Sequence, residues 1–147
     1  MIVENREKFI KRLKLSSNVI KFIFAKSLFS LGEMVSEKLL FAVASVVMNR
    51  FVYEAEISDT QPDIIKILTS TSLFPEWKNT KYMDGIDVSS NRFKKCFGVG
   101  VLALSGKLKD SARQSIAFMK KGKSSLWADG LLPCLVIDDY AFYNNCA

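Results

Sequence analysis

The residue types in this chain restrict its chemistry before any fold is considered. Its 147 residues include no histidine, which excludes Ser-His and Cys-His nucleophile pairs and the usual histidine metal sites. Catalysis would therefore depend on carboxylates, hydroxyls, thiols or lysines. Glycoside cleavage is the major reaction class that needs only carboxyl groups, because one acid protonates the leaving oxygen while the positive transition state is stabilised nearby.

The three cysteines, Cys96, Cys134 and Cys146, are odd in number and show no CxxC spacing. This pattern argues against a disulfide framework and against a zinc site. We therefore expect free thiols in a reducing compartment, with no metal and no cofactor.

The net charge of +6 favours a polyanionic partner, and peptidoglycan, nucleic acid and membrane surfaces all fit that description. A solvated lysine face would produce the same charge.

The most apolar window, residues 19–31, contains Lys21 and Lys26 and is shorter than a bilayer span, so we expect a core helix and no transmembrane segment. The charged, periodic start lacks the features of a signal peptide, which predicts synthesis in the cytoplasm without an export signal.

Hydrophobic periodicity predicts one domain that is helical for most of its length. A basic amphipathic helix is expected at residues 3–15, and a second helix is expected from Ser16 or Ser17 to Leu31, ended by Gly32. Ser36 is the expected cap of a long buried helix that extends to Phe51. Further helices are predicted at residues 60–68, with a threonine cap and an early proline, and at 90–104, with a loop between them at 69–88.

The pattern changes to short β-prone runs after Asp110. Strands are predicted at residues 115–119, 135–137 and 141–143, with a turn at Asp138-Asp139 and an exposed loop at 120–125. The expected fold class is therefore α+β, mainly helical with a small antiparallel sheet near the C-terminus.

Several segments resemble the SleB-type, or spore-cortex-lytic, family of cell wall hydrolases. Residues 24–51, FAKSLFSLGEMVSEKLLFAVASVVMNRF, are similar to the family's Gly-Glu turn and its helix ending in Val-x-Asn-Arg. Residues 103–106 with Asp110 resemble its Ala-Leu-x-Gly then Asp-x-Thr segment. Residues 116–119, Trp127 and 137–143 resemble its sheet and closing hairpin.

The resemblance implies a lysozyme-like domain at residues 24–147, preceded by the basic helix and lead-in at 1–23. It also implies that one glutamate in the turn acts as general acid. Gapless alignment places Leu31 at that position, whereas a shift of two residues makes Glu33 the catalytic acid and puts Glu37 near the second acid. The alternative for Glu33 is an ordinary exposed turn residue.

Other positions also bear on the resemblance. Phe74 and Trp77 resemble the family's aromatic segment and are expected to bind substrate by stacking on sugar rings, although such a loop aromatic more often pins its loop to the core. The chain departs from the family at Ala112, Gln114 and Tyr140, where threonine, glycine and histidine are expected.

The leading interpretation is a peptidoglycan glycosidase, of the lytic transglycosylase kind, that acts on the bond between N-acetylmuramic acid and N-acetylglucosamine. Such a protein would be virion-associated or released to reach the cell wall. The second interpretation is a catalytically decayed relative that binds glycan strands or serves as a structural component of a larger assembly, such as a phage virion. A third, a basic nucleic-acid-binding domain, rests on charge alone, and no nucleic-acid partner is expected.

Overall fold

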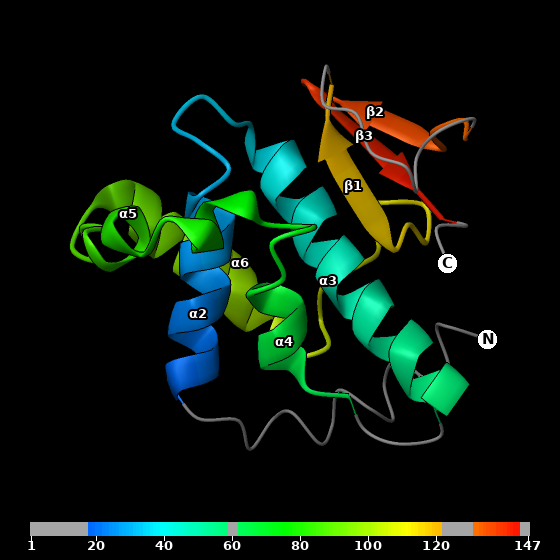
Figure 1. The fold of residues 1–147 in the computed structure, drawn as a ribbon, viewed down its shortest axis with the longest axis horizontal. Coiled ribbons are helices and arrows are strands. Elements are labelled where there is room, and N and C mark those ends of the chain that lie inside the picture. Colours follow the sequence, from blue (N-terminus) through cyan, green and yellow to red (C-terminus); the bar gives the residue numbers. More distant parts are fainter. Residues whose placement is uncertain (1–17, 59–61, 122–130, 145–147) are drawn as a thin grey trace.

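The computed structural model describes residues 18–58, 62–121 and 131–144. The helix predicted at residues 3–15, most of the loop predicted at 120–125, Trp127 and Cys146 lie outside these ranges. The fold is α+β and mainly helical, with a small antiparallel sheet formed by the last strands (Figure 1). This fold class is the one predicted from the sequence.

Helix α3 (Glu37–Ser58) lies at the centre of the molecule, between the sheet and the other helices (Figure 1). It is buried almost continuously from Leu39 to Val52. Its start matches the predicted cap, because the Ser36 hydroxyl oxygen accepts a hydrogen bond from the Leu39 N–H at 3.1 Å. Small residues on α3, including Ala42, Ala44 and Ser45, are fully buried, as expected where neighbouring elements approach closely.

Helix α2 (Asn18–Phe29) packs along α6 (Asn91–Leu104). Gly100 on α6 makes this approach possible, because a Cβ there would lie 3.2 Å from two side-chain atoms of Phe24 on α2. Gly98 on the same helix differs, because no atom of the described residues outside the helix backbone lies within 4 Å of its Cβ position. Close packing against α2 therefore accounts for the glycine at Gly100 and not for the one at Gly98.

The segment between α3 and α6 holds more structure than predicted. Helix α4 (Ile64–Leu68) is capped by Asp63, whose carboxylate accepts from the Ile65 N–H at 2.9 Å. The cap is thus the acid itself, and Pro62 precedes the helix instead of entering its first turn.

The predicted loop at 69–88 contains the 3₁₀ helix η1 (Pro75–Lys78) and helix α5 (Thr80–Asp84). Pro75 occupies the first turn of η1, where proline fits best, and the Asn79 side chain caps α5 by accepting from the Tyr82 N–H at 3.1 Å. Both signals are present in the sequence, but each element is about one turn long.

The sheet has the strand order β1-β3-β2, and both pairs are antiparallel. It consists of β1 (Ala117–Lys120), β2 (Leu135–Ile137) and β3 (Tyr140–Tyr143). These strands match the predicted ones apart from shifts at the ends, so the predicted sheet and its closing hairpin are confirmed. Strand β1 packs on α3, which places the hairpin beside the helical part of the molecule.

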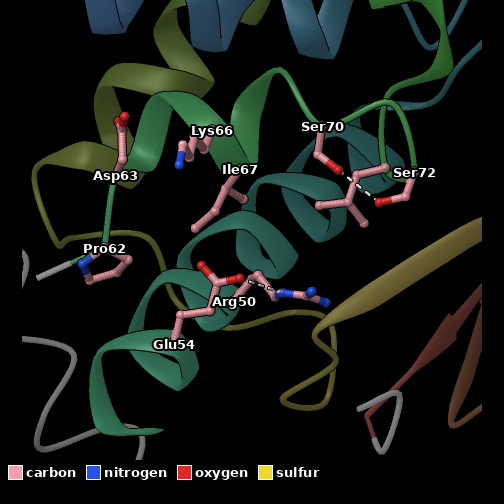
Figure 2. Close-up of a pocket in the computed structure, with 9 residues that line it drawn as sticks. Arg50, Glu54, Pro62, Asp63, Lys66, Ile67, Ser70 and Ser72 are labelled. Atoms are coloured by element: carbon pink, nitrogen blue, oxygen red, sulfur yellow. Dashed lines mark hydrogen bonds and ion pairs between the residues drawn. The ribbon is translucent and has the colours of Figure 1, made fainter. Parts of the chain in front are cut away.

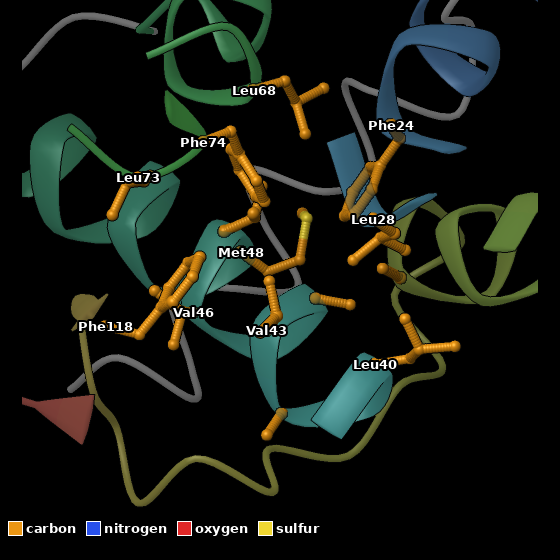
Figure 3. Packing of buried hydrophobic residues seen from close by; sticks show 14 of the residues in the cluster. Phe24, Leu28, Leu40, Val43, Val46, Met48, Leu68, Leu73, Phe74 and Phe118 are labelled. Atoms are coloured by element: carbon orange, nitrogen blue, oxygen red, sulfur yellow. The ribbon is translucent and has the colours of Figure 1, made fainter. Parts of the chain in front are cut away.

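The main hydrophobic core surrounds α3 and joins helices to sheet (Figure 3). Its largest fully buried side chains include the phenylalanines Phe24, Phe51, Phe74, Phe118 and Phe142. Burial of one such ring stabilises the fold by roughly 2–3 kcal/mol relative to leaving it in water. Cys96 is buried and both described thiols, Cys96 and Cys134, are free as predicted.

Candidate functional site

The turn between α2 and α3 carries Glu33 and separates two surface hollows. Gly32, with φ of 121°, turns the chain after α2, and Glu33 follows with an exposed side chain. Glu33 and Val35 line both hollows. The two hollows are therefore adjacent, and Glu33 lies at their boundary.

The hairpin hollow, of about 270 Å³, lies between this turn and the β2–β3 hairpin. It is lined by Leu31, Gly32, Glu33, Met34, Val35, Leu39, Lys120, Asp138, Asp139 and Tyr140. Three carboxylates, one ammonium group and one phenol therefore lie around the apolar side chains of this hollow. The two chain segments that supply these carboxylates are about 100 residues apart in sequence.

Asp138 fixes the hairpin to the start of α3. Its Oδ2 accepts hydrogen bonds from the Ser36 hydroxyl at 2.7 Å and from the Ser36 N–H at 3.3 Å. Asp138 has a left-handed backbone, with φ of 51°, a conformation that aspartate and asparagine adopt more readily than most residues. The bonds also place a negative charge at the N-terminus of α3, which the helix dipole favours.

Tyr140, which stands where the resemblance led us to expect histidine, closes the other side of the hairpin hollow. Its hydroxyl donates to the backbone carbonyl of Leu31 at 3.3 Å, and its ring contacts that of Phe118 with centroids 5.9 Å apart. Burial, with further contributions from the charges of Asp139 and Glu76, raises the pKa of the Tyr140 phenol. The hydroxyl therefore stays protonated near neutral pH and acts as a hydrogen-bond donor.

The α6 hollow, of about 330 Å³, lies on the other side of Glu33, between the turn, α3 and α6. It is lined by Glu33, Val35, Glu37, Leu40, Asn91, Arg92, Lys95 and Cys96. Glu37 Oε2 forms an ion pair with Lys95 Nζ at 2.9 Å. The two predicted acids, Glu33 and Glu37, thus share a hollow with two cations of α6, a helix that is distant in sequence.

Arg92 connects α6 to the end of α2. Its guanidinium carbon lies 3.6 Å from the centroid of the Phe29 ring, within range of a cation–π interaction. Its Nη2 donates a hydrogen bond to the backbone carbonyl of Phe29. The guanidinium is therefore held in one orientation beside the turn that carries Glu33.

Phe74 was predicted to stack on a sugar ring, but it lines neither hollow in the structure. The side chain is fully buried and lies in the core near Met48, Leu68 and Leu73 (Figure 3). Its ring meets that of Phe118 edge-on, with centroids 5.5 Å apart. No ring face is open to a ligand, because the hydrophobic gain of burying a phenylalanine holds it inside.

Trp77 is half-buried and does not line either hollow beside Glu33. Its indole Nε1 donates to the Ser27 hydroxyl at 3.0 Å, and that hydroxyl donates to the Leu68 carbonyl at 2.7 Å. Trp77 therefore ties η1 to α2, which is the anchoring role weighed for it from the sequence. It also lines a largely apolar hollow of about 420 Å³ with Phe22, Ile23 and other residues of α2.

The residues of the Val-x-Asn-Arg motif hold the segment that leads into the sheet. Asn49 is fully buried, and its Nδ2 donates to Asp110 Oδ1 and to the Ser115 carbonyl, both at 3.2 Å. The Asp110 carboxylate also accepts from the N–H groups of Ala112 at 2.9 Å and Gln114 at 2.7 Å. This network supports a tight loop in which Gln114 has φ of 62°. A left-handed backbone at this position is what glycine accommodates best.

Arg50 of the same motif lines a separate hollow of about 290 Å³ between α3 and α4 (Figure 2). The polar groups around it bond largely with each other: Arg50 Nε contacts Glu54 Oε1 at 3.2 Å, and the hydroxyls of Ser70 and Ser72 lie 2.7 Å apart. Arg50 Nη1 also donates to the Ile116 carbonyl at 3.3 Å. This hollow contains none of the predicted site residues.

Sequence reasoning missed the contribution of α6 to the site. Arg92 and Lys95 are three residues apart and so share one face of that helix, which is the signal that was present. What the sequence did not show is that α6 packs along α2 and brings this face to Glu33. Lys120 was also missed, because its strand reaches the hairpin hollow only through the β1–β3 pairing.

Within the described ranges, no cluster of three or more cysteine and acidic side chains could hold a metal ion. Among the helices of these same residues, none combines the length and the apolar character needed to cross a bilayer. Comparison of the whole chain with protein-family models, with curated proteins and with solved structures finds no match.

Proposed function

We propose that this chain is a peptidoglycan glycosidase domain of the lytic transglycosylase kind, in which Glu33 donates the proton. The observation that supports the proposal is the hairpin hollow. The two segments that resemble the catalytic turn and the closing hairpin of the SleB-type family, residues 31–35 and 138–140, meet there around Glu33. A shared hollow is required if both segments are to act on one sugar chain.

In the proposed reaction, the protonated Glu33 transfers its proton to the oxygen that links N-acetylmuramic acid to N-acetylglucosamine. The bond between that oxygen and the anomeric carbon breaks at the same time. The positive charge that develops on the sugar is stabilised by the nearby carboxylates of Asp138 and Asp139. A hydroxyl of the same sugar then attacks the anomeric carbon and returns its proton to Glu33. An anhydro sugar results, and no second carboxylate is needed to activate water.

A second candidate function is glycan binding without catalysis. It is favoured by two observations: Leu31 occupies the gapless catalytic position, and Glu33 is exposed to solvent. A glycan chain could then lie across the same two hollows without being cleaved. The two functions share a binding site and differ only in whether Glu33 transfers a proton.

Digestion of purified peptidoglycan by the wild type, Glu33→Gln and Asp84→Asn separates these functions. Asp84 is an exposed acid at the end of α5 that lines neither hollow beside Glu33, so it controls for the loss of one carboxylate. We expect anhydro products from the wild type and from Asp84→Asn. Glu33→Gln should lower turnover by a factor on the order of 10² while binding to sedimented peptidoglycan persists.

Equal activity of the wild type and Glu33→Gln would remove Glu33 from the mechanism. Binding without cleavage by all three proteins would instead support the non-catalytic function. Neither binding nor cleavage would reject both.

A further inference from the structure

We propose that the α6 hollow recognises a carboxylate carried by the glycan, and that Lys95 and Arg92 bind it. This inference rests on the proposed function, because it assigns a substrate group to one side of Glu33. It goes further in naming two specificity-determining residues on a helix outside the segments that resemble the catalytic turn and the hairpin.

The position of the hollow is the first argument. Glu33 and Val35 line both hollows, so a sugar chain whose reacting bond lies at Glu33 extends into one hollow on each side. The groups that line the α6 hollow would then contact the sugar next to the cleaved bond.

The second argument is the difference in charge between the two sides. Apart from Glu33, which lines both hollows, the α6 hollow carries the cations Arg92 and Lys95 against one carboxylate, that of Glu37. The hairpin hollow has the opposite balance, with two aspartates against the single cation Lys120. A glycan that bears a carboxylate on one sugar is therefore oriented with that sugar towards α6.

Arg92 is already held in place for this role. Stacking on the Phe29 ring at 3.6 Å and the hydrogen bond to the Phe29 carbonyl fix the plane of its guanidinium. A donor group that is ordered before the ligand arrives loses little conformational entropy on binding.

Lys95 can exchange its present partner, the carboxylate of Glu37, for a carboxylate of the ligand. Its ion pair with Glu37 joins side chains that are 52% and 57% exposed, and pairs with such exposure contribute little stability because water screens them. A ligand carboxylate can therefore replace Glu37 as the partner of the ammonium group. Glu37 then acts as a competitor of the ligand.

The experiment measures binding of two tetrasaccharides by calorimetry in the Glu33→Gln background, which prevents cleavage and mimics the neutral acid. One is a peptidoglycan tetrasaccharide without stem peptides, which keeps its lactyl carboxylates. The other is chitotetraose, which has the same backbone and no carboxylate. Lys95→Met is compared with Lys94→Met, because Lys94 is the exposed neighbour on α6 and does not line the hollow.

We expect Lys95→Met to weaken binding of the carboxylated tetrasaccharide by about fivefold to tenfold and to leave chitotetraose binding unchanged. Lys94→Met should change neither affinity. Glu37→Gln should strengthen binding of the carboxylated ligand, because it removes the competing carboxylate.

If the carboxylated ligand binds and Lys95→Met has no effect, or weakens both ligands equally, the inference is overturned while the proposed function stands. If the parent binds neither tetrasaccharide, the proposed function fails and this inference fails with it.

Discussion

The hydroxyl of Ser36 donates a hydrogen bond of 2.7 Å to the carboxylate of Asp138, across 102 positions of sequence. The same hydroxyl oxygen accepts from the Leu39 N–H at 3.1 Å. One serine thus caps α3 and holds the hairpin against it, so the hairpin hollow depends on the start of a core helix.

Replacing Asp138 tests this connection. Asp138→Ala removes both hydrogen bonds to Ser36 and leaves alanine at a φ of 51°, so we expect a loss of about 2 kcal/mol in the free energy of unfolding. Asp138→Asn keeps an acceptor oxygen and tolerates that backbone, and should cost less than about 1 kcal/mol. Urea denaturation measures both, with Asp139→Ala as the control because it removes the adjacent exposed carboxylate. Equal losses in Asp138→Ala and Asp139→Ala would contradict the role given to Asp138.

The two glycines of α6 form a matched pair. Gly98→Ala meets no atom within 4 Å and should stabilise the protein by about 0.5–1 kcal/mol through helix propensity. Gly100→Ala brings a methyl group to 3.2 Å from Phe24 atoms and should lose that gain and more, because α2 and α6 must separate slightly. Thermal unfolding should therefore rank the midpoints Gly98→Ala, wild type, Gly100→Ala. A higher midpoint for Gly100→Ala than for Gly98→Ala would show that α2 and α6 can separate without loss of stability.

Gln114 has φ of 62°, a conformation that costs a non-glycine residue roughly 1–2 kcal/mol. Gln114→Gly relieves this cost but makes the unfolded chain more flexible, so we expect a net gain of up to about 1 kcal/mol in unfolding free energy. Gln114→Ala removes the same side chain without relieving the backbone and serves as the control. Chemical denaturation measures the free energy of unfolding of both variants. Equal values for the alanine and glycine variants would argue against backbone strain in this loop.

Burial of Cys96 should make stability depend on pH in the alkaline range. Burial raises the pKa of this thiol from 9.0 to about 11, against the opposing charges of Arg92 and Lys95. The folded state holds the thiol proton more tightly than the unfolded state does. The thiol's contribution to the free energy of unfolding is therefore complete below pH 9. It is lost as the pH rises towards 11, at about 1.4 kcal/mol for each pH unit.

The measurement is the unfolding free energy of the wild type and Cys96→Ala from pH 8 to pH 11. We expect the difference between the two proteins to shrink with rising pH, because alanine lacks the titrating group. A difference that stays constant over this range would show that the thiol does not ionise differently in the two states.

Much of the fold could be predicted because local signals and burial agree in it. The Ser36 cap, the long buried helix that follows it, the helix predicted at 90–104 and the short β-prone runs near the C-terminus are all local signals, and the structure shows each predicted element. The elements that were missed, η1 and α5, are too short to show a hydrophobic period. Their caps were present, but a cap alone does not distinguish a helix from a turn.

The candidate site was harder to predict because it depends on which segments meet. The sequence does not distinguish a loop aromatic that faces solvent from one that fills the core, and Phe74 is fully buried. Nor does it show that the Arg92 face of α6 lies beside Glu33. Both outcomes are decided by long-range packing around α3, which is a property of the assembled chain.

The strand order of the sheet affects how the protein acquires its site during synthesis. The middle strand, β3, is the last of the described strands to leave the ribosome, and β1 and β2 each pair only with it. Until Tyr140 to Tyr143 emerge, two strands lack their partner and the Tyr140 hydroxyl cannot reach Leu31. The helical part can form before β3 is synthesised, whereas the hairpin hollow closes only after β3 has emerged, so any activity located there must wait for the last strand of the sheet.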